Sequence, residues 1–166
     1  MEQLKKLKPH LIVILLFVGI SFIYFSPVLE GKVLKTDDVT NWQGMSKEIM
    51  DFREATGEEP LWTNSMFSGM PAYQISIQYK SNLIQYINRA LMLGLPKPLN
   101  ILFLYLLGFY ILLLSLKIDY RLSAVGAIAF AFSSYFFIII QAGHMTKAHA
   151  IGYLPMVIAA VLYTYR

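Results

Sequence analysis

Two adjacent carboxylates, Asp37 and Asp38, stand at the head of a long polar segment that follows the first long apolar run of the sequence. Such side chains can take a proton from a hydroxyl group or bind a divalent cation such as Mg²⁺ or Mn²⁺. A simpler interpretation is that Thr36, Asp37 or Asp38 caps a helix that begins near Val39, since threonine and aspartate are favoured as caps. The residues alone favour the capping role.

A second group of polar side chains, His144, Lys147 and His149, follows the third apolar run. In a helix, His144 and Lys147 would be one turn apart on the same face, where two cations could hold a phosphate group. The other interpretation is that these side chains mark a membrane interface, where basic side chains extend toward water. Their spacing does not place both histidines on one helical face as a zinc site requires, so we do not expect zinc here.

The composition predicts an integral membrane protein. Hydrophobic residues make up 57% of the sequence and charged residues 14%, and the mean hydropathy is +0.54. A soluble domain carries about a quarter charged residues. Three apolar runs approach the roughly 20 residues that a helix needs to cross a bilayer, and a fourth, shorter run reaches the last residues. The expected fold is therefore all-α, with several transmembrane helices.

The sequence between the first two apolar runs is long enough to form an outer subdomain, and the chain is expected to stop inside its fourth span. The predicted organisation is a cytoplasmic basic N-terminus (1–10), transmembrane helix 1 (11–29), an outer loop subdomain (30–98), transmembrane helix 2 (99–116), a cytoplasmic loop (117–121), transmembrane helix 3 (122–140), an outer loop (141–149) and a truncated transmembrane helix 4 (150–166).

Basic residues set the predicted orientation. Lysines precede the first apolar run, and Lys117 and Arg121 lie in the short loop between the second and third runs. Because cytoplasmic loops carry an excess of lysine and arginine, the N-terminus is expected on the cytoplasmic side. The net charge of +4 comes from scattered residues, several at the ends of apolar runs, so nucleic acid is not an expected partner. Membrane lipid is.

The outer subdomain should fold rather than remain disordered, because it is rich in aromatic residues. Two short helices are expected in it, at 46–55 and 82–93, both too short to cross a membrane. Residues 64–73 are expected to form an irregular loop of the kind that carries binding residues. Trp42 could stack on a sugar ring, and Asn64 and Gln74 could either form hydrogen bonds with sugar hydroxyls or shape a turn. An aromatic belt at the membrane surface would explain the tryptophan without a ligand.

Three segments together resemble a known family. GKVLKTDDVTNWQGM and TGEEPLWTNSMFSGMPAYQ follow the first apolar run, and QAGHMTKAHAIGYLPMV follows the third. In this arrangement, behind a basic N-terminus, the chain resembles the N-terminal part of the bacterial YfhO-type membrane proteins over nearly its whole length. That family is counted among the GT-C-like glycosyltransferases, polytopic enzymes with an acidic motif and interfacial helices in the first outer loop.

The resemblance implies inverting transfer of a sugar from a polyprenyl-phosphate carrier to a glycan or cell-wall polymer, on the outer face of the bacterial cytoplasmic membrane. It shifts the preference for the acid pair from capping to catalysis. Asp37 or Asp38 would take the proton of the acceptor hydroxyl, with Asp37 slightly preferred, while the other orients a hydroxyl or holds a divalent cation. His144, Lys147 and His149 would hold the carrier phosphate. The alternative is a non-catalytic transporter or scaffold for lipid-linked glycans, although transporters usually place ionisable residues inside their spans.

Overall fold

The computed structural model describes residues 2–79 and 81–165, with side chains from Leu7 onward. In these residues the chain is mostly helical, which confirms the predicted predominance of helices. The chain divides into two compact units. The helical unit comprises the residues up to Leu34 and from Tyr86 onward, and the loop unit is Lys35–Gln85.

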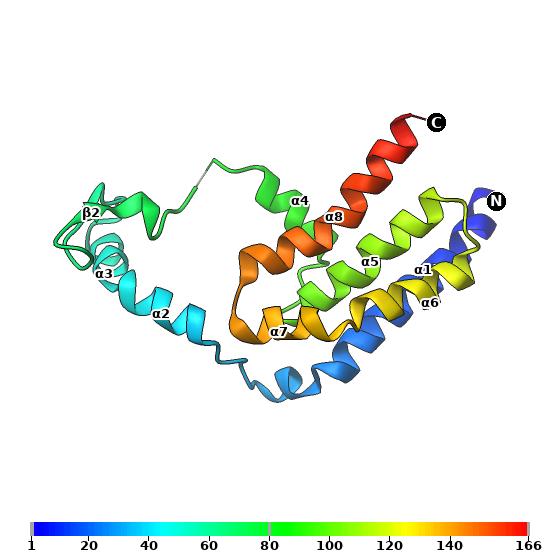
Figure 1. The fold of residues 1–166 in the computed structure, drawn as a ribbon, viewed down its shortest axis with the longest axis horizontal. Coiled ribbons are helices and arrows are strands. Elements are labelled where there is room, and N and C mark those ends of the chain that lie inside the picture. The colour runs from blue at the N-terminus through cyan, green and yellow to red at the C-terminus, as the bar shows by residue number, and fades with distance from the viewer. Residues whose placement is uncertain (1, 80, 166) are drawn as a thin grey trace. The chain divides into compact units, whose positions relative to one another are not determined.

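The helical unit is built around one buried helix, α5. Its helices are α1 (Glu2–Tyr24), α4 (Ile84–Leu91, which begins at the end of the loop unit), α5 (Leu99–Ser115), α6 (Tyr120–Ala131), α7 (Ser134–Ala142) and α8 (Met145–Thr164). Within this unit α5 lies between α8 on one side and α6 and α1 on the other (Figure 1). A helix that is apolar all round, as α5 is, must be covered on every side by other helices or by lipid.

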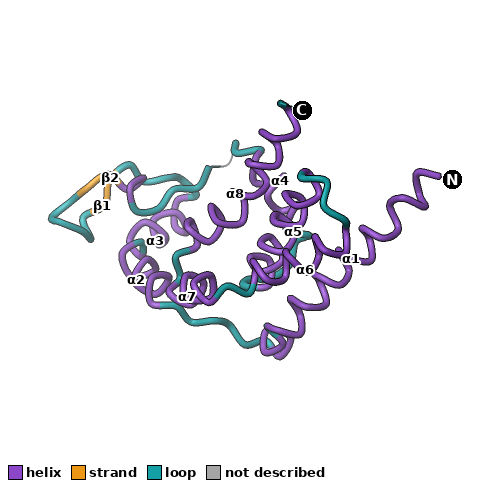
Figure 2. The backbone as a smooth tube through the Cα atoms, turned by 45° about the vertical axis from the view of Figure 1, so that its right-hand side comes forward, coloured by secondary structure: helices purple, strands orange, loops and turns teal. Residues whose placement is uncertain are grey.

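Aromatic contacts fix the directions of the helices around α5. His10 near the start of α1 accepts or donates a hydrogen bond of 2.7 Å with the hydroxyl of Tyr110 in α5, and its ring lies against Tyr120 at the start of α6. At the other end of α1, Tyr24 contacts Phe132, which follows α6. The helices α1 and α6 therefore run in the same direction, as the tube in Figure 2 also shows.

Glycines allow α5 and α8 to pack at very short distance. A Cβ atom on Gly108 of α5 would lie 2.5 Å from the carbonyl oxygen of Gly152 in α8. A Cβ atom on Gly152 would lie 2.6 Å from Leu104 Cδ2. Small residues at such contacts let transmembrane helices approach through their backbones, where dispersion replaces the hydrophobic effect that lipid does not provide. Leu104 of α5 lies against Gly152 of α8, and Gly108, one turn later in α5, lies against both Gly152 and Met156. Later residues of α5 therefore meet later residues of α8, so the two helices run parallel.

Among the residues that the structure describes, two helices are long and apolar enough to cross a membrane, at Leu7–Tyr24 and Met145–Thr164. A third crossing is possible if α6 and α7, which are bent by 50° at their junction, count as one broken span. Helix α5 has 17 residues and is a shorter apolar helix. That length lies at the lower limit for a transmembrane helix, about 17 residues.

The first and third predicted spans differ from the structure at their ends. Helix α1 stops at Tyr24 rather than continuing to residue 29, and the chain turns into a 3-10 helix at Ser26–Glu30. The cause is Pro27, which disfavours a helical backbone in the preceding residue and lacks the N–H that an α-helix needs. The span predicted for 122–140 is broken before Ser133, which has an extended backbone (φ −60°, ψ 128°). Serine is favoured at the start of a new helix.

The predicted outer loop 141–149 is also shorter in the structure. Gly143 adopts a left-handed backbone (φ 88°) after α7, and α8 begins two residues later at Met145. Lys147 and His149 are thus inside a helix rather than in a loop. The sequence pattern missed this start because the first turn of α8 is polar, and hydropathy alone begins the span at its first apolar residues.

In residues 35–79 and 81–83, the loop unit contains two α-helices and one hairpin. Its elements are α2 (Asp37–Met45), α3 (Lys47–Thr56), β1 (Trp62–Thr63), β2 (Met70–Pro71) and a 3-10 turn at Ala72–Gln74. The strands are antiparallel, with Trp62 opposite Pro71 and Thr63 opposite Met70. The irregular loop predicted for 64–73 is therefore the connection and second strand of a hairpin, followed by the first residues of the 3-10 turn. A two-residue strand of this kind has too little alternation to be recognised in sequence.

The first prediction concerns the α5–α8 contact. Gly108→Ala should destabilise the helical unit by about 1–3 kcal/mol, because the new methyl group meets a backbone oxygen that cannot move aside without separating the helices. Unfolding titrations in detergent measure this. Gly19→Ala is the matched control, since a Cβ atom at Gly19 of α1 meets nothing within 4 Å. Alanine there should be neutral or stabilising, by up to about 1 kcal/mol. Equal effects of the two substitutions would contradict the close packing.

Candidate functional site

The acid pair occupies the first turn of α2. The helix begins at Asp37, and Thr36 precedes it with an extended backbone (φ −125°, ψ 142°). Both carboxylates are exposed. Negative charge in the first turn stabilises a helix through its dipole and its N–H groups. The helix starts two residues earlier than predicted, and the side chain of Thr36 at its N-cap position makes no capping hydrogen bond. Both the capping role and the catalytic role of the acid pair stay predictions.

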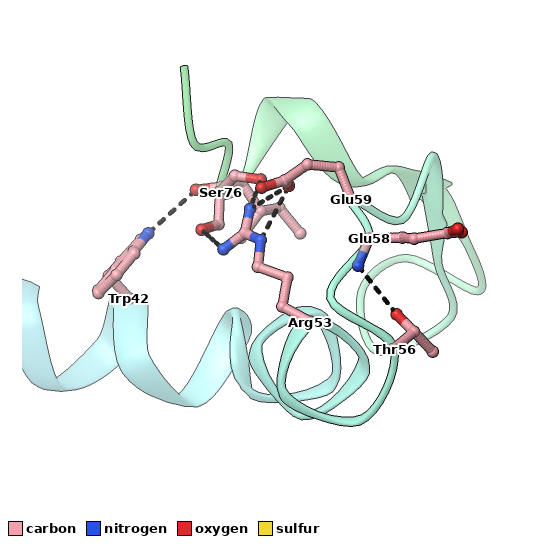
Figure 3. Close-up of polar contacts among 7 residues, drawn as sticks. Trp42, Arg53, Thr56, Glu58, Glu59 and Ser76 are labelled. Carbon is pink, nitrogen blue, oxygen red and sulfur yellow. Dashed lines mark hydrogen bonds and ion pairs between the residues drawn. The ribbon is translucent and has the colours of Figure 1, made fainter. Parts of the chain in front are cut away.

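Trp42 lies one turn after the acid pair. Asp38 and Trp42 are four residues apart on α2, so their side chains share a face. The indole N–H of Trp42 donates a hydrogen bond of 3.0 Å to the backbone oxygen of Ile75 (Figure 3). The tryptophan therefore ties α2 to the segment after the hairpin, while 40% of the residue remains exposed. A partly exposed tryptophan one helical turn from a carboxylate suits a sugar as well as a membrane interface.

The other two predicted sugar contacts lie on different elements. Asn64 is in the hairpin connection and Gln74 in the 3-10 turn that follows β2, and both are exposed. The backbone N–H of Asn64 donates to Glu48 Oε2 over 2.9 Å. Asn64 thus has a structural role through its backbone, and its side-chain role in binding stays a prediction.

Glu48 was not identified from the sequence, yet it holds the hairpin in place. Its Oε2 atom accepts hydrogen bonds from the backbone N–H groups of Asn64 and Ser65, each 2.9 Å long, and from the hydroxyl of Thr63. These donors, the Thr63 hydroxyl foremost, favour the charged carboxylate and lower the pKa of Glu48 below its ordinary value. No sequence pattern predicts that a glutamate on a short helix will accept hydrogen bonds from backbone amides more than a dozen residues away.

Arg53 makes a second polar cross-link that the sequence did not indicate. Its guanidinium donates to Glu59 Oε2, at 2.8 Å from Nε, and to both the hydroxyl (3.0 Å) and the backbone oxygen (2.9 Å) of Ser76 (Figure 3). The arginine side chain is only 12% exposed and that of Glu59 30%. A planar guanidinium with several donors suits such a convergence of acceptors. Arg53 therefore joins α3 to the segments on both sides of the hairpin.

In the helical unit, the predicted phosphate ligands surround the start of α8. His144 occupies the N-cap position, and Lys147 lies in the first turn with its Nζ atom 5.5 Å from the centre of the Tyr135 ring. Both residues are exposed. His149 is one turn further, and its Nδ1 atom contacts the backbone oxygen of Met145 at 2.7 Å. The start of α8 thus combines a helix N-terminus with an oriented lysine, a combination that attracts anions.

The acid pair alone is a sparse metal site. In the described part of the chain, no group of three or more histidine, aspartate and glutamate side chains could hold a metal ion. Mg²⁺ often uses only one or two carboxylates, provided that substrate phosphates and water complete its shell. The binding of a divalent cation by Asp37 and Asp38 stays a prediction, and it would need such a substrate to complete the shell.

No family model, curated protein or solved structure matches the chain. The resemblance to the YfhO-type proteins therefore stays a prediction. The geometry provides two separate groups of candidate residues: the acid pair with Trp42 in the loop unit, and His144 with Lys147 in the helical unit.

The second prediction concerns Glu48. Because the fold lowers the pKa of this carboxyl group, its charged form stabilises the hairpin above the ordinary glutamate pKa, and this contribution is lost as the pH falls through the lowered value. Glu48→Gln should therefore reduce the hydrogen-exchange protection of the hairpin amides at neutral pH, since charge-assisted hydrogen bonds are stronger than neutral ones.

The parent and Glu48→Gln should become alike at low pH, when the parent carboxyl is protonated. Protection factors measured from neutral to acidic pH, corrected for intrinsic exchange, provide the test. Glu54→Gln, an exposed position on the same helix, is the control and should leave hairpin protection unchanged. A pH-independent difference between parent and Glu48→Gln would contradict the role of the charge.

Proposed function

We propose that this chain is the N-terminal part of a GT-C-like membrane glycosyltransferase of the YfhO type. It would move a sugar from a polyprenyl-phosphate carrier to a glycan or cell-wall polymer on the outer face of the bacterial cytoplasmic membrane. The observation that carries the proposal is the start of α8, where a helix long and apolar enough to cross a membrane begins with His144 and Lys147. A lipid-linked phosphate would lie at the surface of the bilayer, where such a helix begins.

The start of α8 would assist the chemistry of sugar transfer. As the sugar leaves its carrier, negative charge develops on the phosphate, and oriented cations and helix N–H groups stabilise that charge. The contact of Lys147 with Tyr135 restricts the lysine side chain before any ligand binds. A cation held in position loses less conformational entropy on binding than a freely moving one.

The distribution of basic residues supports the proposed orientation. The start of α1 lies beside the end of α5 and the start of α6, as the contacts of His10 record. Lys8, Lys117 and Arg121 belong to these ends. By the positive-inside rule this end of the helical unit would be cytoplasmic. Since α8 runs parallel to α5, its His144 end would then face outward.

The acid pair would supply the base. An acceptor hydroxyl is a poor nucleophile at neutral pH, and a carboxylate that takes its proton contributes typically ~10²–10⁴ in rate. We assign this role to Asp37 and a substrate-orienting role to Asp38, which shares a helix face with the exposed ring of Trp42. A divalent cation brought with the substrate phosphate would also bind these oxygens, and it would supply charge neutralisation there.

The third prediction tests the base. In the complete protein, Asp37→Asn or Asp38→Asn should lower sugar transfer by ~10² or more if that carboxylate takes the proton, because asparagine keeps the shape but cannot act as a base. Transfer of labelled sugar from polyprenyl phosphate is the measurement. Asp51→Asn is the matched control, since Asp51 lies in the same unit and pairs with Lys47 at the surface. Full transfer by both variants of the acid pair would return Asp37 and Asp38 to a capping role.

The fourth prediction concerns the phosphate contact. Lys147→Met should weaken binding of polyprenyl phosphate, because methionine keeps an apolar stem and removes the charge. Binding is measured in detergent at low salt and near 1 M salt, where an exposed charge contact is largely screened. Lys32→Met is the control, an exposed lysine of the same unit that pairs with Glu30. Unchanged binding by Lys147→Met at low salt would make Lys147 an interface anchor.

A transporter or scaffold for lipid-linked glycans is the second candidate, and two observations favour it. If α6 and α7 cross the membrane together, their junction would be a broken span of the kind that lines binding sites in transporters. Within the described residues, the hydroxyl of Tyr105 and the side-chain oxygen of Asn100 are buried without a hydrogen-bond partner. A transporter would move the carrier across proteoliposome membranes with no acceptor present, whereas a transferase would need the acceptor for any change in the carrier.

A further inference from the structure

The hairpin of the loop unit presents apolar side chains to its surroundings. Phe67, in the connection between the two strands, is 84% exposed, as is Leu61 just before β1. Trp62 is 56% exposed. Scattered apolar residues on a protein surface need no explanation, but several on one hairpin do.

The end of the hairpin is held rigidly in this exposed form. Glu48 accepts the backbone N–H groups of Asn64 and Ser65, and the Ser65 hydroxyl donates to the Met45 backbone oxygen over 3.2 Å. Gly69 has a backbone that favours glycine (φ 121°), and a Cβ atom there would lie 2.8 Å from Trp62 Nε1. The backbone of residue 69 therefore lies directly against the indole ring. Such a framework displays Phe67 in one conformation.

The backbone of Phe67 itself is in a sparsely populated region. Its φ angle is 51° and that of Ser68 is 62°, both in the left-handed region. This conformation is unfavourable for a bulky residue, and strain of this kind persists where surrounding contacts impose it, often at functional positions. A phenylalanine at a strained, exposed position contributes no burial that would compensate for the strain within the loop unit.

The charge pattern points to an apolar environment around the hairpin. No charged residue occurs from Pro60 to Tyr79, a segment that includes Trp62, Tyr73 and Tyr79. Helix α3 of the same unit, in contrast, carries both acidic and basic residues (KEIMDFREAT). Tryptophan and tyrosine are enriched at membrane–water interfaces, and charged residues are costly below them. The hairpin segment has the composition of a structure that enters the interface.

The chain also tethers the loop unit close to apolar helices. The unit begins at Lys35, eleven residues after α1 ends at Tyr24, and this segment can extend at most about 40 Å. At its other end the unit leads directly into α4. Both connections go to helices of the unit that contains the membrane-crossing candidates. A bilayer is therefore the apolar phase within reach of the hairpin.

We propose that the hairpin from Leu61 to Pro71 inserts Phe67 into the interfacial region of the lipid bilayer, with Trp62 at the level of the head groups. The strained connection aims the phenylalanine ring outward, and Glu48 keeps it so aimed. The hairpin would act as an anchor that fixes the loop unit against the membrane surface. This inference rests on the exposed hairpin and its tether, and it does not depend on sugar transfer.

The fluorescence of Trp62 tests the proposal directly. The sequence has two tryptophans, so Trp42→Phe leaves Trp62 as the only emitter. In proteoliposomes that contain brominated phosphatidylcholine, Trp62 emission should be quenched by the lipid and protected from aqueous iodide. Quenching by iodide without quenching by brominated lipid would overturn the proposal. Circular dichroism of the Trp42→Phe protein verifies that the fold is kept.

Phe67→Asn separates insertion from folding. Asparagine accepts a positive φ angle more readily than phenylalanine, so the hairpin should retain its conformation. Loss of the ring should lower the ratio of inserted to withdrawn hairpins by on the order of tenfold. This factor corresponds to the lower end of the free energy gained when a phenylalanine side chain is buried. Quenching by brominated lipid should therefore fall. Phe52→Gln, which removes an exposed aromatic residue from α3, is the matched control and should leave Trp62 quenching unchanged.

A protein occupant would give a different result. If the hairpin binds a second copy of the chain, Trp62 should be protected from both quenchers at high protein density, and iodide quenching should return as the protein is diluted with lipid. That outcome would overturn the membrane assignment. Lipid quenching that persists on dilution and is lost in Phe67→Asn supports it.

Discussion

The close contact between Gly108 and Gly152 is the constraint on which the helical unit depends. Because neither glycine has a side chain, the backbones of α5 and α8 lie so close that a methyl group would not fit between them. This contact fixes both the separation and the relative rotation of the two helices. A glycine inside a helix costs about 0.5–1 kcal/mol relative to alanine, so its presence on both sides of one crossing needs an offsetting contribution. Backbone-to-backbone packing along the crossing is that contribution, because lipid offers no hydrophobic force between helices.

The two units are stabilised by different interactions. In the helical unit, apolar side chains and aromatic rings around α5 form a continuous core. In the loop unit, few apolar side chains are fully buried, Ile49 and Ala72 among them. Hydrogen bonds from Trp42 and Arg53, and to Glu48, connect its helices to the hairpin instead. This arrangement leaves the apolar residues of the hairpin outside, since polar cross-links replace the core that those residues would otherwise form.

Sequence reasoning predicted most helices of the helical unit and missed most of the contacts that organise the loop unit. Long apolar runs determine where helices occur, because backbone groups in an apolar phase must be paired internally. Their ends depend on single residues: Pro27 ends α1 early, and Ser133 separates α6 from α7. Glu48 and Arg53 act on partners distant in the sequence, and no local pattern identifies such partners. The acid pair was found as a candidate and its helix was foreseen, while its catalytic role is still a prediction.

The early start of α8 changes what its polar residues can do. In a loop, Lys147 would sample many positions and would extend to water wherever its stem allowed. In the structure it belongs to the first turn of a helix that begins behind Gly143, and its Nζ atom lies over the Tyr135 ring. The bend between α6 and α7 places Tyr135 in the short helix just before this turn. The bend between α6 and α7 and the contact of Lys147 with Tyr135 are therefore parts of one arrangement, because a continuous helix through Ser133 would direct the Tyr135 ring elsewhere.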